Sequence, residues 1–258
     1  MIILEGVTKL AGTGGSKRQV LVAAGVELPS NRRIAVFGRS AVDKRTFIDL
    51  LAGVAVPDAG RIVRNARLSF PAGYIGGFTR ELPVRVNVAH VARLYGADVD
   101  RVVSFVAQVL KLGEAYNRPY EQLGNAARKN LSAVLAFSIP FDVYLLTDDI
   151  LQVKDSQFNK DARALFEARA KTSGMIIATE DPDFAREFCD MGLIINDGKL
   201  RLFKNLDRAI KVYETTIQRT PLERPRRAMQ VSENIPKRTP EERARRRQRR
   251  RKRKGAPD

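Results

Sequence analysis

The chain has 258 residues, 44% of them hydrophobic, and its 46 Lys and Arg outnumber its 29 Asp and Glu to leave a net charge of +17. This length suits one or two globular domains, and no apolar run approaches the ~20 residues that a spanning helix needs. One cysteine excludes an internal disulfide framework and suits a reducing cytosol. One histidine, His90, excludes multi-histidine metal sites and any Ser-His-Asp catalysis that His90 does not itself serve. Residues 1–6 carry no basic segment, so no signal peptide is expected.

The first third of the chain alternates between extended segments and turns. Strands are predicted at residues 2–8, 19–28, 33–38 and 61–63, with a turn region, AGTGGS, at 11–16. The segment RIAVFG at 33–38 is a short apolar run that ends in glycine, which is typical of a buried parallel strand. A loop is expected after it, followed by an apolar-periodic helical segment at 47–51.

The middle of the chain is helical and the last third mixes strands with helices. Helices are predicted at 84–95, 99–110 with Asp98 as its cap, 125–137, 156–170, 182–188 and 206–217. Strands are predicted at 141–146, 175–178, 193–195 and 200–203, the last two joined by an Asn-Asp-Gly hairpin turn at 196–198. Strand–loop–helix units at both ends, with helices between them, predict an α/β core with a helical insertion.

The composition changes near Thr220. From Pro221 to Asp258 there are 15 Lys and Arg against 5 Asp and Glu, a net charge of +10, together with several prolines and few apolar residues. Such a segment cannot bury enough apolar surface to offset the entropy lost on ordering. The sequence therefore predicts one domain at 1–220 and a disordered polybasic tail at 221–258.

A candidate phosphate loop follows the strand at 33–38. The pattern for such a loop is Gly-x-x-x-x-Gly-Lys-Ser/Thr between a strand and a helix, and residues 38–46 read GRSAVDKRT. Gly38 and Lys44 have the right spacing, whereas Asp43 replaces the second glycine and Arg45 replaces the hydroxyl residue that normally ligates Mg²⁺. Thr46 comes one position late. A carboxylate beside a polyanion costs about 4 kcal/mol at 4 Å and an effective dielectric of about 20.

This segment alone supports two interpretations, a damaged phosphate site or a strand-to-helix turn without a ligand. In the first, Arg39, Lys44 and Arg45 would attract phosphate by charge. A second feature favours that interpretation: the strand VYLLT at 143–147 ends in two acids. Asp148 would hold Mg²⁺ through water and Asp149, shorter than the usual Glu, would polarise the attacking water. Solvated acids at a strand end are the alternative, but the order and spacing of the two features favour a nucleotide fold.

Further segments resemble the ATP-binding subunits of ABC exporters for capsular polysaccharide, O antigen and teichoic acid. They are LAGV at 51–54, PDAGRI at 57–62, GYIGGF at 73–78, NV at 87–88, VARLYG at 91–96, FDVYLL at 141–146, KDSQF at 154–158, FCD at 188–190, DGKL at 197–200 and LDRAI at 206–210. The resemblance is discontinuous but spans almost all of residues 2–217. It implies an ABC-type P-loop nucleotide-binding domain with a small N-terminal β-subdomain and a helical subdomain at about 80–140.

The resemblance also assigns site residues and reveals departures. The implied nucleotide-contacting set is Gly38, Arg39, Ser40, Asp43, Lys44, Arg45 and Thr46, with Thr46 and Asp148 at the metal and Asp148, Asp149 and Glu180 at catalytic positions. Glu180 stands where the family has a switch histidine near the γ-phosphate. The segment LGNAAR at 123–128 has no intact Ser-Gly pair for a partner's ATP, residues 10–16 include no adenine-stacking aromatic, and residues 74–78 include no glutamine.

These departures predict a non-hydrolysing or feebly hydrolysing ABC subunit, with ATP and Mg²⁺ as its expected cofactors, that acts beside an active partner or regulates one. It would lie in the cytoplasm at the inner face of the membrane, with a separate transmembrane permease, in a homodimer or a heterodimer with another ABC subunit. The tail has no aromatic residue, which argues against base stacking, so we expect it to bind anionic lipid rather than RNA. Two alternatives stay open: a non-hydrolysing adaptor or nucleic-acid-binding protein acting through its tail, and an ordinary ATPase in which Thr46 and Asp149 compensate.

Overall fold

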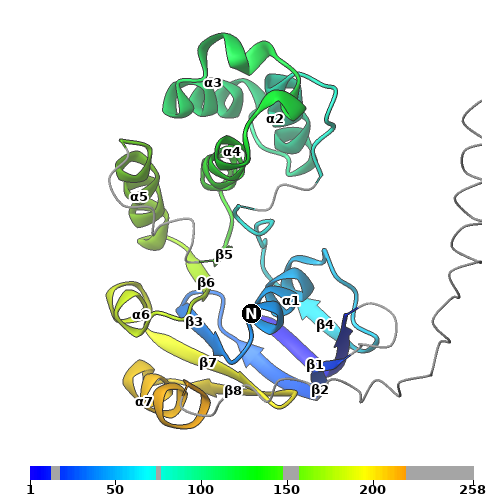
Figure 1. Cartoon of the computed structure of the whole chain (residues 1–258), viewed down its shortest axis with the longest axis vertical. Coiled ribbons are helices and arrows are strands. Elements are labelled where there is room, and N and C mark those ends of the chain that lie inside the picture. Colours follow the sequence, from blue (N-terminus) through cyan, green and yellow to red (C-terminus); the bar gives the residue numbers. More distant parts are fainter. Residues whose placement is uncertain (13–17, 74–76, 148–156, 219–258) are drawn as a thin grey trace, which may run out of the picture. The chain divides into compact units, whose positions relative to one another are not determined.

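Two β-sheets form the framework of the domain (Figure 1). The computed structural model describes residues 1–12, 18–73, 77–147 and 157–218, which belong to one compact unit, Met1–Thr220. A three-stranded antiparallel sheet has the order β2 (Arg18–Leu28), β1 (Ile2–Ala11), β4 (Ala59–Arg64). A five-stranded sheet has the order β5 (Val143–Thr147), β6 (Gly174–Ala178), β3 (Arg33–Gly38), β7 (Met191–Asn196), β8 (Lys199–Phe203). Adjacent strands of this sheet run parallel to each other, except that β7 and β8 are antiparallel.

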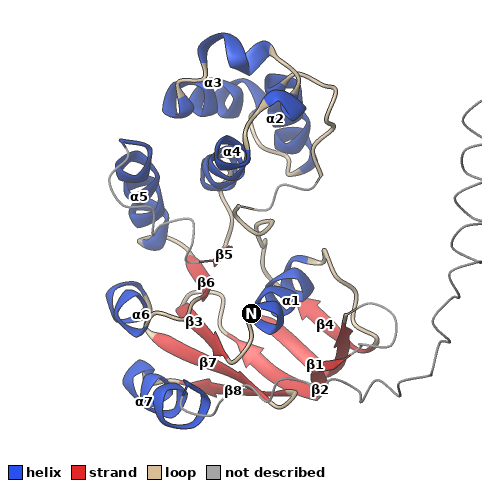
Figure 2. Ribbon diagram, viewed as in Figure 1, coloured by secondary structure: helices blue, strands red, loops and turns tan. Residues whose placement is uncertain are grey.

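Helices lie in connections between strands, and one more helix follows β8 (Figure 2). They are α1 (Ala41–Ala52), α2 (Val84–Leu94), α3 (Val99–Leu110), α4 (Asn125–Ser138), α5 (Gln157–Ala170), α6 (Pro182–Phe188) and α7 (Leu206–Val212), with 3₁₀ turns at Gly113–Asn117 and Tyr120–Gln122. In Figure 1, α2, α3 and α4 form a group apart from the sheets. The predicted α/β core with a helical insertion is confirmed. No helix in the described part of the chain is long and apolar enough to cross a membrane.

The central strand β3 is buried on both of its faces. Ile34 and Val36 belong to the apolar cluster that contains α1 and the three-stranded sheet. Ala35 and Phe37 point the other way, into the cluster that contains α7, and the Phe37 ring stacks on Tyr213 with 4.8 Å between centroids. Because successive side chains of a strand point to opposite faces, packing on both sides fixes the direction of β3. The loop that follows Gly38 therefore starts from a rigid position.

Local signals set several element boundaries as predicted. Asp98 caps α3, since its carboxylate accepts a hydrogen bond from the Arg101 N–H at 3.0 Å. The hairpin between β7 and β8 turns on Asp197 and Gly198, whose φ angles of 47° and 76° suit a two-residue turn of the type that needs positive φ at both positions. The strand at 33–38 and the helix at 182–188 also match.

Two helices differ from the prediction. The helix at 206–217 is α-helical only to Val212 and continues as a π-helix at Tyr213–Gln218. The larger difference is α1, which begins at Ala41 rather than near Phe47. Residues 13–17, 74–76, 148–156 and 219–258 lie outside the described part of the chain, and with them lie most of the predicted turn region at 11–16 and the predictions for Asp148, Asp149 and the tail.

Candidate nucleotide-binding site

The predicted phosphate loop is mostly helix. Only Arg39 and Ser40 connect β3 to α1. Ser40 caps α1: its Oγ accepts from the Val42 N–H at 3.2 Å, and its carbonyl oxygen accepts from the N–H groups of Asp43 and Lys44 at 3.1 and 3.2 Å. Without a glycine at position 43, no residue there favours an open loop. A serine followed three residues later by an acid is itself a helix-start pattern, and this signal in the sequence was missed.

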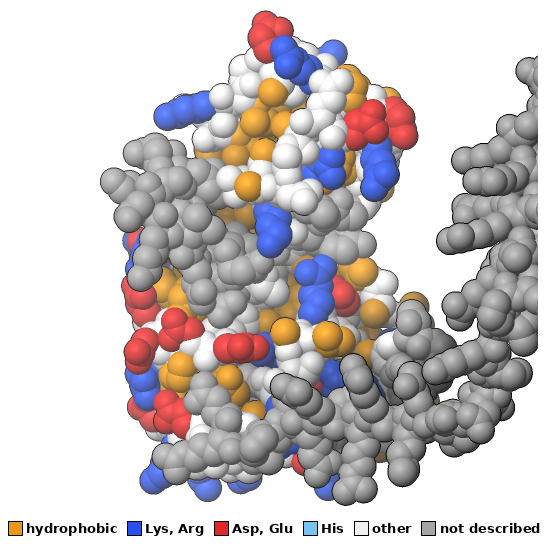
Figure 3. Space-filling model, in the orientation of Figure 1, with side chains coloured by type: hydrophobic (Ala, Val, Ile, Leu, Met, Phe, Trp, Pro, Cys, Tyr) orange, Lys and Arg blue, Asp and Glu red, His pale blue; other side chains and the backbone are white. Residues whose placement is uncertain are grey.

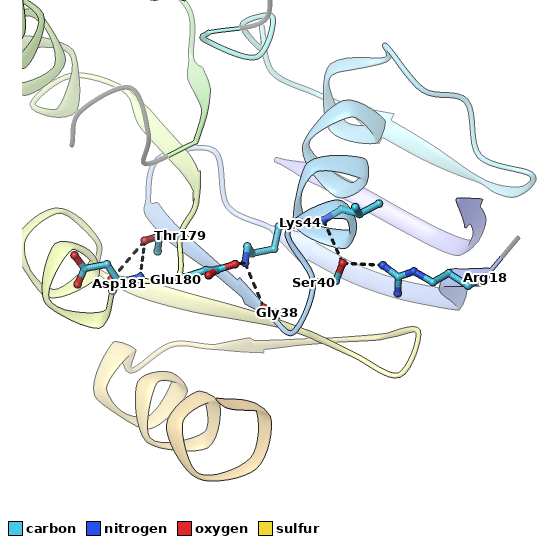
Figure 4. A network of polar contacts seen from close by, with 8 residues as sticks. Arg18, Gly38, Ser40, Lys44, Thr179, Glu180 and Asp181 are labelled. Carbon is cyan, nitrogen blue, oxygen red and sulfur yellow. Dashed lines mark hydrogen bonds and ion pairs between the residues drawn. The ribbon is translucent and has the colours of Figure 1, made fainter. Parts of the chain in front are cut away.

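The lysine of this segment is buried and already paired. Lys44 is 4% exposed, and its Nζ donates to Glu180 Oε1 at 2.7 Å and to the Gly38 carbonyl oxygen at 3.3 Å (Figure 4). The structure thus brings together three of the predicted site residues. A buried ammonium requires a partner because the loss of hydration is costly. Glu180 supplies that partner although its own side chain is 61% exposed.

Glu180 reaches Lys44 because its backbone is tied to the neighbouring strands and helix. The Thr179 N–H donates to the Val36 carbonyl oxygen of β3 at 3.1 Å. Thr179 Oγ1 accepts from the Asp181 N–H at 3.0 Å, and Asp181 Oδ1 caps α6 by accepting from the Asp183 N–H at 2.9 Å. Thr179 and Asp181 therefore position Glu180, a role that the sequence analysis did not assign.

Asp43 faces an arginine that the sequence analysis did not identify. Arg18, at the start of β2, donates to both carboxylate oxygens of Asp43, one of them at 3.0 Å, and to Ser40 Oγ at 2.8 Å. Burial raises the pKa of the Asp43 carboxyl above its ordinary value, while the Arg18 guanidinium opposes that rise. The carboxylate that was expected to repel a polyanion is thus balanced by a cation from the other sheet.

The remaining predicted site residues differ in burial and in whether their side chains already have hydrogen-bond partners. Arg45 donates through Nε to both oxygens of Asp49 at 2.9 and 3.1 Å, one turn along α1. The Nε of Arg39 is buried and has no hydrogen-bond partner in the described part of the chain. Thr46 is half-buried. Among the described residues, no group of three or more His, Cys, Asp or Glu side chains is placed to hold a metal ion.

The segment at 123–128 forms the start of α4. Gly124 is its N-cap residue and makes no side-chain hydrogen bond there. Arg128 lies over the Tyr120 ring, 5.0 Å from its centroid, and donates to the Glu121 carbonyl oxygen at 2.6 Å. Arg128 therefore holds the preceding turn against α4.

Comparison with curated proteins finds relatives along most of the chain, although no family model matches it. The polysialic acid transport ATP-binding protein KpsT of Escherichia coli is 30% identical over 217 residues, which are 83% of this chain and 96% of KpsT. The ATP-binding protein BexA of Haemophilus influenzae is 30% identical over 84% of this chain and 99% of BexA. The capsule polysaccharide export ATP-binding protein CtrD of Neisseria meningitidis is 29% identical over 83% of this chain and 99% of CtrD.

Solved structures show the same architecture. An ATP-binding subunit of an ABC transporter superposes with a TM-score of 0.65 over 83% of this chain and 93% of its own length, at 16% identity. The ATP-binding cassette MJ0796, in a dimeric structure with ADP and phosphate, superposes with a TM-score of 0.62 over 78% of this chain and 97% of its own. At this identity the likeness concerns the fold alone.

Proposed function

This chain belongs to the family of ATP-binding subunits of ABC transporters for capsule and polysaccharide export, and from this premise we propose that it is a degenerate subunit with weak or absent ATP hydrolysis. It binds nucleotide next to β3 and works with a hydrolytically active partner subunit and a separate membrane permease. In this proposal residues 1–220 form the nucleotide-binding domain, and the helices between 84 and 138 form its helical subdomain.

The Lys44–Glu180 ion pair is the observation that carries this proposal. In P-loop proteins the lysine reaches the β- and γ-phosphates. Here its ammonium is buried and held at 2.7 Å by a carboxylate. A phosphate must compete with that carboxylate, and an anion beside the reacting phosphate opposes the electrostatic stabilisation on which phosphoryl transfer depends. Slow turnover follows from this arrangement.

The residues present still fit a phosphate group. Lys44 supplies a buried ammonium, and Arg39 supplies a buried Nε without a partner in the described residues. Both lie next to the N-terminus of α1, which favours anions through its helix dipole. These groups would hold the phosphates, and bound Mg²⁺ would supply charge neutralisation, with Thr46 and Asp148 as its proposed ligands. Asp148 and Asp149 keep their proposed catalytic roles.

The partners follow from family membership. KpsT and CtrD are named for transport and export, so we place this chain on the cytoplasmic face of the membrane beside a permease made of other polypeptides. MJ0796 is dimeric, and we propose a dimer with an active ABC subunit. The basic tail at 221–258 would add electrostatic attraction to anionic lipid, about 1 kcal/mol for each basic residue near the surface.

The test is equilibrium nucleotide binding and Mg²⁺-dependent ATP hydrolysis by the purified full chain, beside a version ending at Thr220 and a Lys44→Ala variant. We expect binding that Lys44→Ala weakens, and a hydrolysis rate near the Lys44→Ala background. The shortened version should behave like the full chain in this assay but bind anionic vesicles less. A robust hydrolysis rate that Lys44→Ala abolishes would show an ordinary transport ATPase and end the proposal.

A further inference from the structure

The carboxylate of Glu180 is paired with the Lys44 ammonium. In P-loop proteins the corresponding lysine binds the nucleotide phosphates. Resting on the proposed function, we infer that Glu180 takes the place of a terminal phosphate and makes this site select nucleoside diphosphates over nucleoside triphosphates. Glu180 is then a specificity-determining residue.

The hydrogen bonds of Lys44 set the number of phosphates that it can serve. An ammonium has three donors. One donates to Glu180 and a second to the Gly38 carbonyl oxygen, and no acceptor for the third lies in the described part of the chain. A diphosphate can use that third donor while the ion pair stays intact. A triphosphate brings another phosphate to the same ammonium, so it must displace Glu180 or lie against its carboxylate.

Displacing Glu180 is possible but unfavourable. Its side chain is 61% exposed, so it can swing into solvent. Its backbone stays in place, because the Thr179–Asp181 turn and the cap of α6 hold it. Once Glu180 leaves, the incoming phosphate must replace its carboxylate as the anionic partner of Lys44, which is 4% exposed. The triphosphate therefore gains this contact only by breaking an existing one, whereas the diphosphate breaks none.

The surrounding charges strengthen this discrimination. Asp43, one residue before Lys44, is paired with Arg18, so in the described part of the chain Glu180 is the carboxylate that pairs with Lys44. Acidic side chains gather near α6 on the face shown in Figure 3. Within α6, Asp183 and Glu187 are exposed. Both are paired with arginines. Since Glu180 is itself largely exposed and screened, we expect a preference of about tenfold, which corresponds to 1.4 kcal/mol.

The experiment measures equilibrium dissociation constants of ADP and of a non-hydrolysable ATP analogue for the full chain. We expect the wild type to bind ADP about tenfold more tightly, an order-of-magnitude figure. Glu180→Gln keeps a hydrogen-bond acceptor on Lys44 but removes the charge, and we expect it to tighten binding of the triphosphate and to close the gap. Glu187→Gln is the matched control, because it removes an exposed carboxylate that does not contact Lys44, and it should keep the wild-type ratio.

Three outcomes would overturn the inference: equal affinities in the wild type, an unchanged ratio in Glu180→Gln, or no binding of either nucleotide. The first and third need no variant, so a folding defect in Glu180→Gln cannot rescue the idea. The hydrolysis rate is a separate readout. Fast turnover with a strong diphosphate preference would refute weak hydrolysis and leave the role of Glu180 standing. Slow turnover with equal affinities would support weak hydrolysis and overturn the role of Glu180.

Discussion

Replacing Arg18 by alanine tests the ion pair that joins the two sheets at the candidate site. Arg18 extends from β2 and donates to the carboxylate of Asp43 and to the hydroxyl of Ser40 at the start of α1. The substitution leaves Asp43, whose side chain is 15% exposed, without its cation. The reverse substitution, Asp43→Asn, leaves an arginine that is 49% exposed and readily hydrated.

The expected cost follows from this difference in burial. A buried polar group without its partner costs about 1–3 kcal/mol, whereas exposed ion pairs contribute about 0.2–1 kcal/mol. Asp43 is mostly buried but Arg18 is half-exposed, so we expect Arg18→Ala to lower the free energy of unfolding by about 1–2 kcal/mol at neutral pH. Asp43→Asn should cost less, and the double variant should recover part of the loss of Arg18→Ala.

The pH dependence gives a second check. Burial already raises the folded pKa of Asp43 above its ordinary value, and Arg18 is the main influence that lowers it. Removing Arg18 raises that folded pKa further. When the pKa of a carboxyl is higher in the folded state than in the unfolded state, the folded protein loses stability as the pH rises from the unfolded pKa through the folded pKa. The penalty of Arg18→Ala should therefore be full at neutral pH and shrink as pH falls toward the ordinary Asp value of about 3.9.

The assay is urea unfolding of the full chain at pH 7 and near pH 4 for the wild type, Arg18→Ala, Asp43→Asn and the double variant. Arg61→Ala serves as the control, since Arg61 forms an exposed ion pair with Glu5, and we expect little change from it. Two results would refute the reasoning: a stability of Arg18→Ala equal to that of Arg61→Ala, or a penalty that Asp43→Asn does not relieve and that stays constant with pH.

Two further predictions concern local structure away from the site. Asp98→Ala removes the cap of α3 and should cost about 1 kcal/mol in urea unfolding, whereas Asp100→Ala, in the first turn of α3, should cost less; equal effects would contradict the capping role. Gly198→Ala places a Cβ 2.6 Å from Val22 Cγ2 at a φ of 76°. It should lower the free energy of unfolding by more than about 1 kcal/mol in the same assay. An unchanged stability would mean that the hairpin relaxes around the new Cβ.

Much of the fold could be predicted from the sequence because its signals are local. The cap at Asp98 and the Asp197–Gly198 turn act over a few residues, so element boundaries nearby were correct. The start of α1 was wrong for a physical reason. The phosphate-loop pattern predicts a loop after Gly38, but without the second glycine the local helix-start signal from Ser40 to Asp43 prevails.

The sequence by itself determined the fold class, the family and the residue types available at the candidate site. Only the tertiary structure decided which charges meet. Lys44 and Glu180 are 136 positions apart, and Arg18 and Asp43 are 25 apart. The first pair forms because β3 and β6 are parallel neighbours, so that the residues after both strands lie at the same edge of the sheet. The second forms because β2 of the other sheet starts beside α1, a proximity that no spacing along the chain encodes.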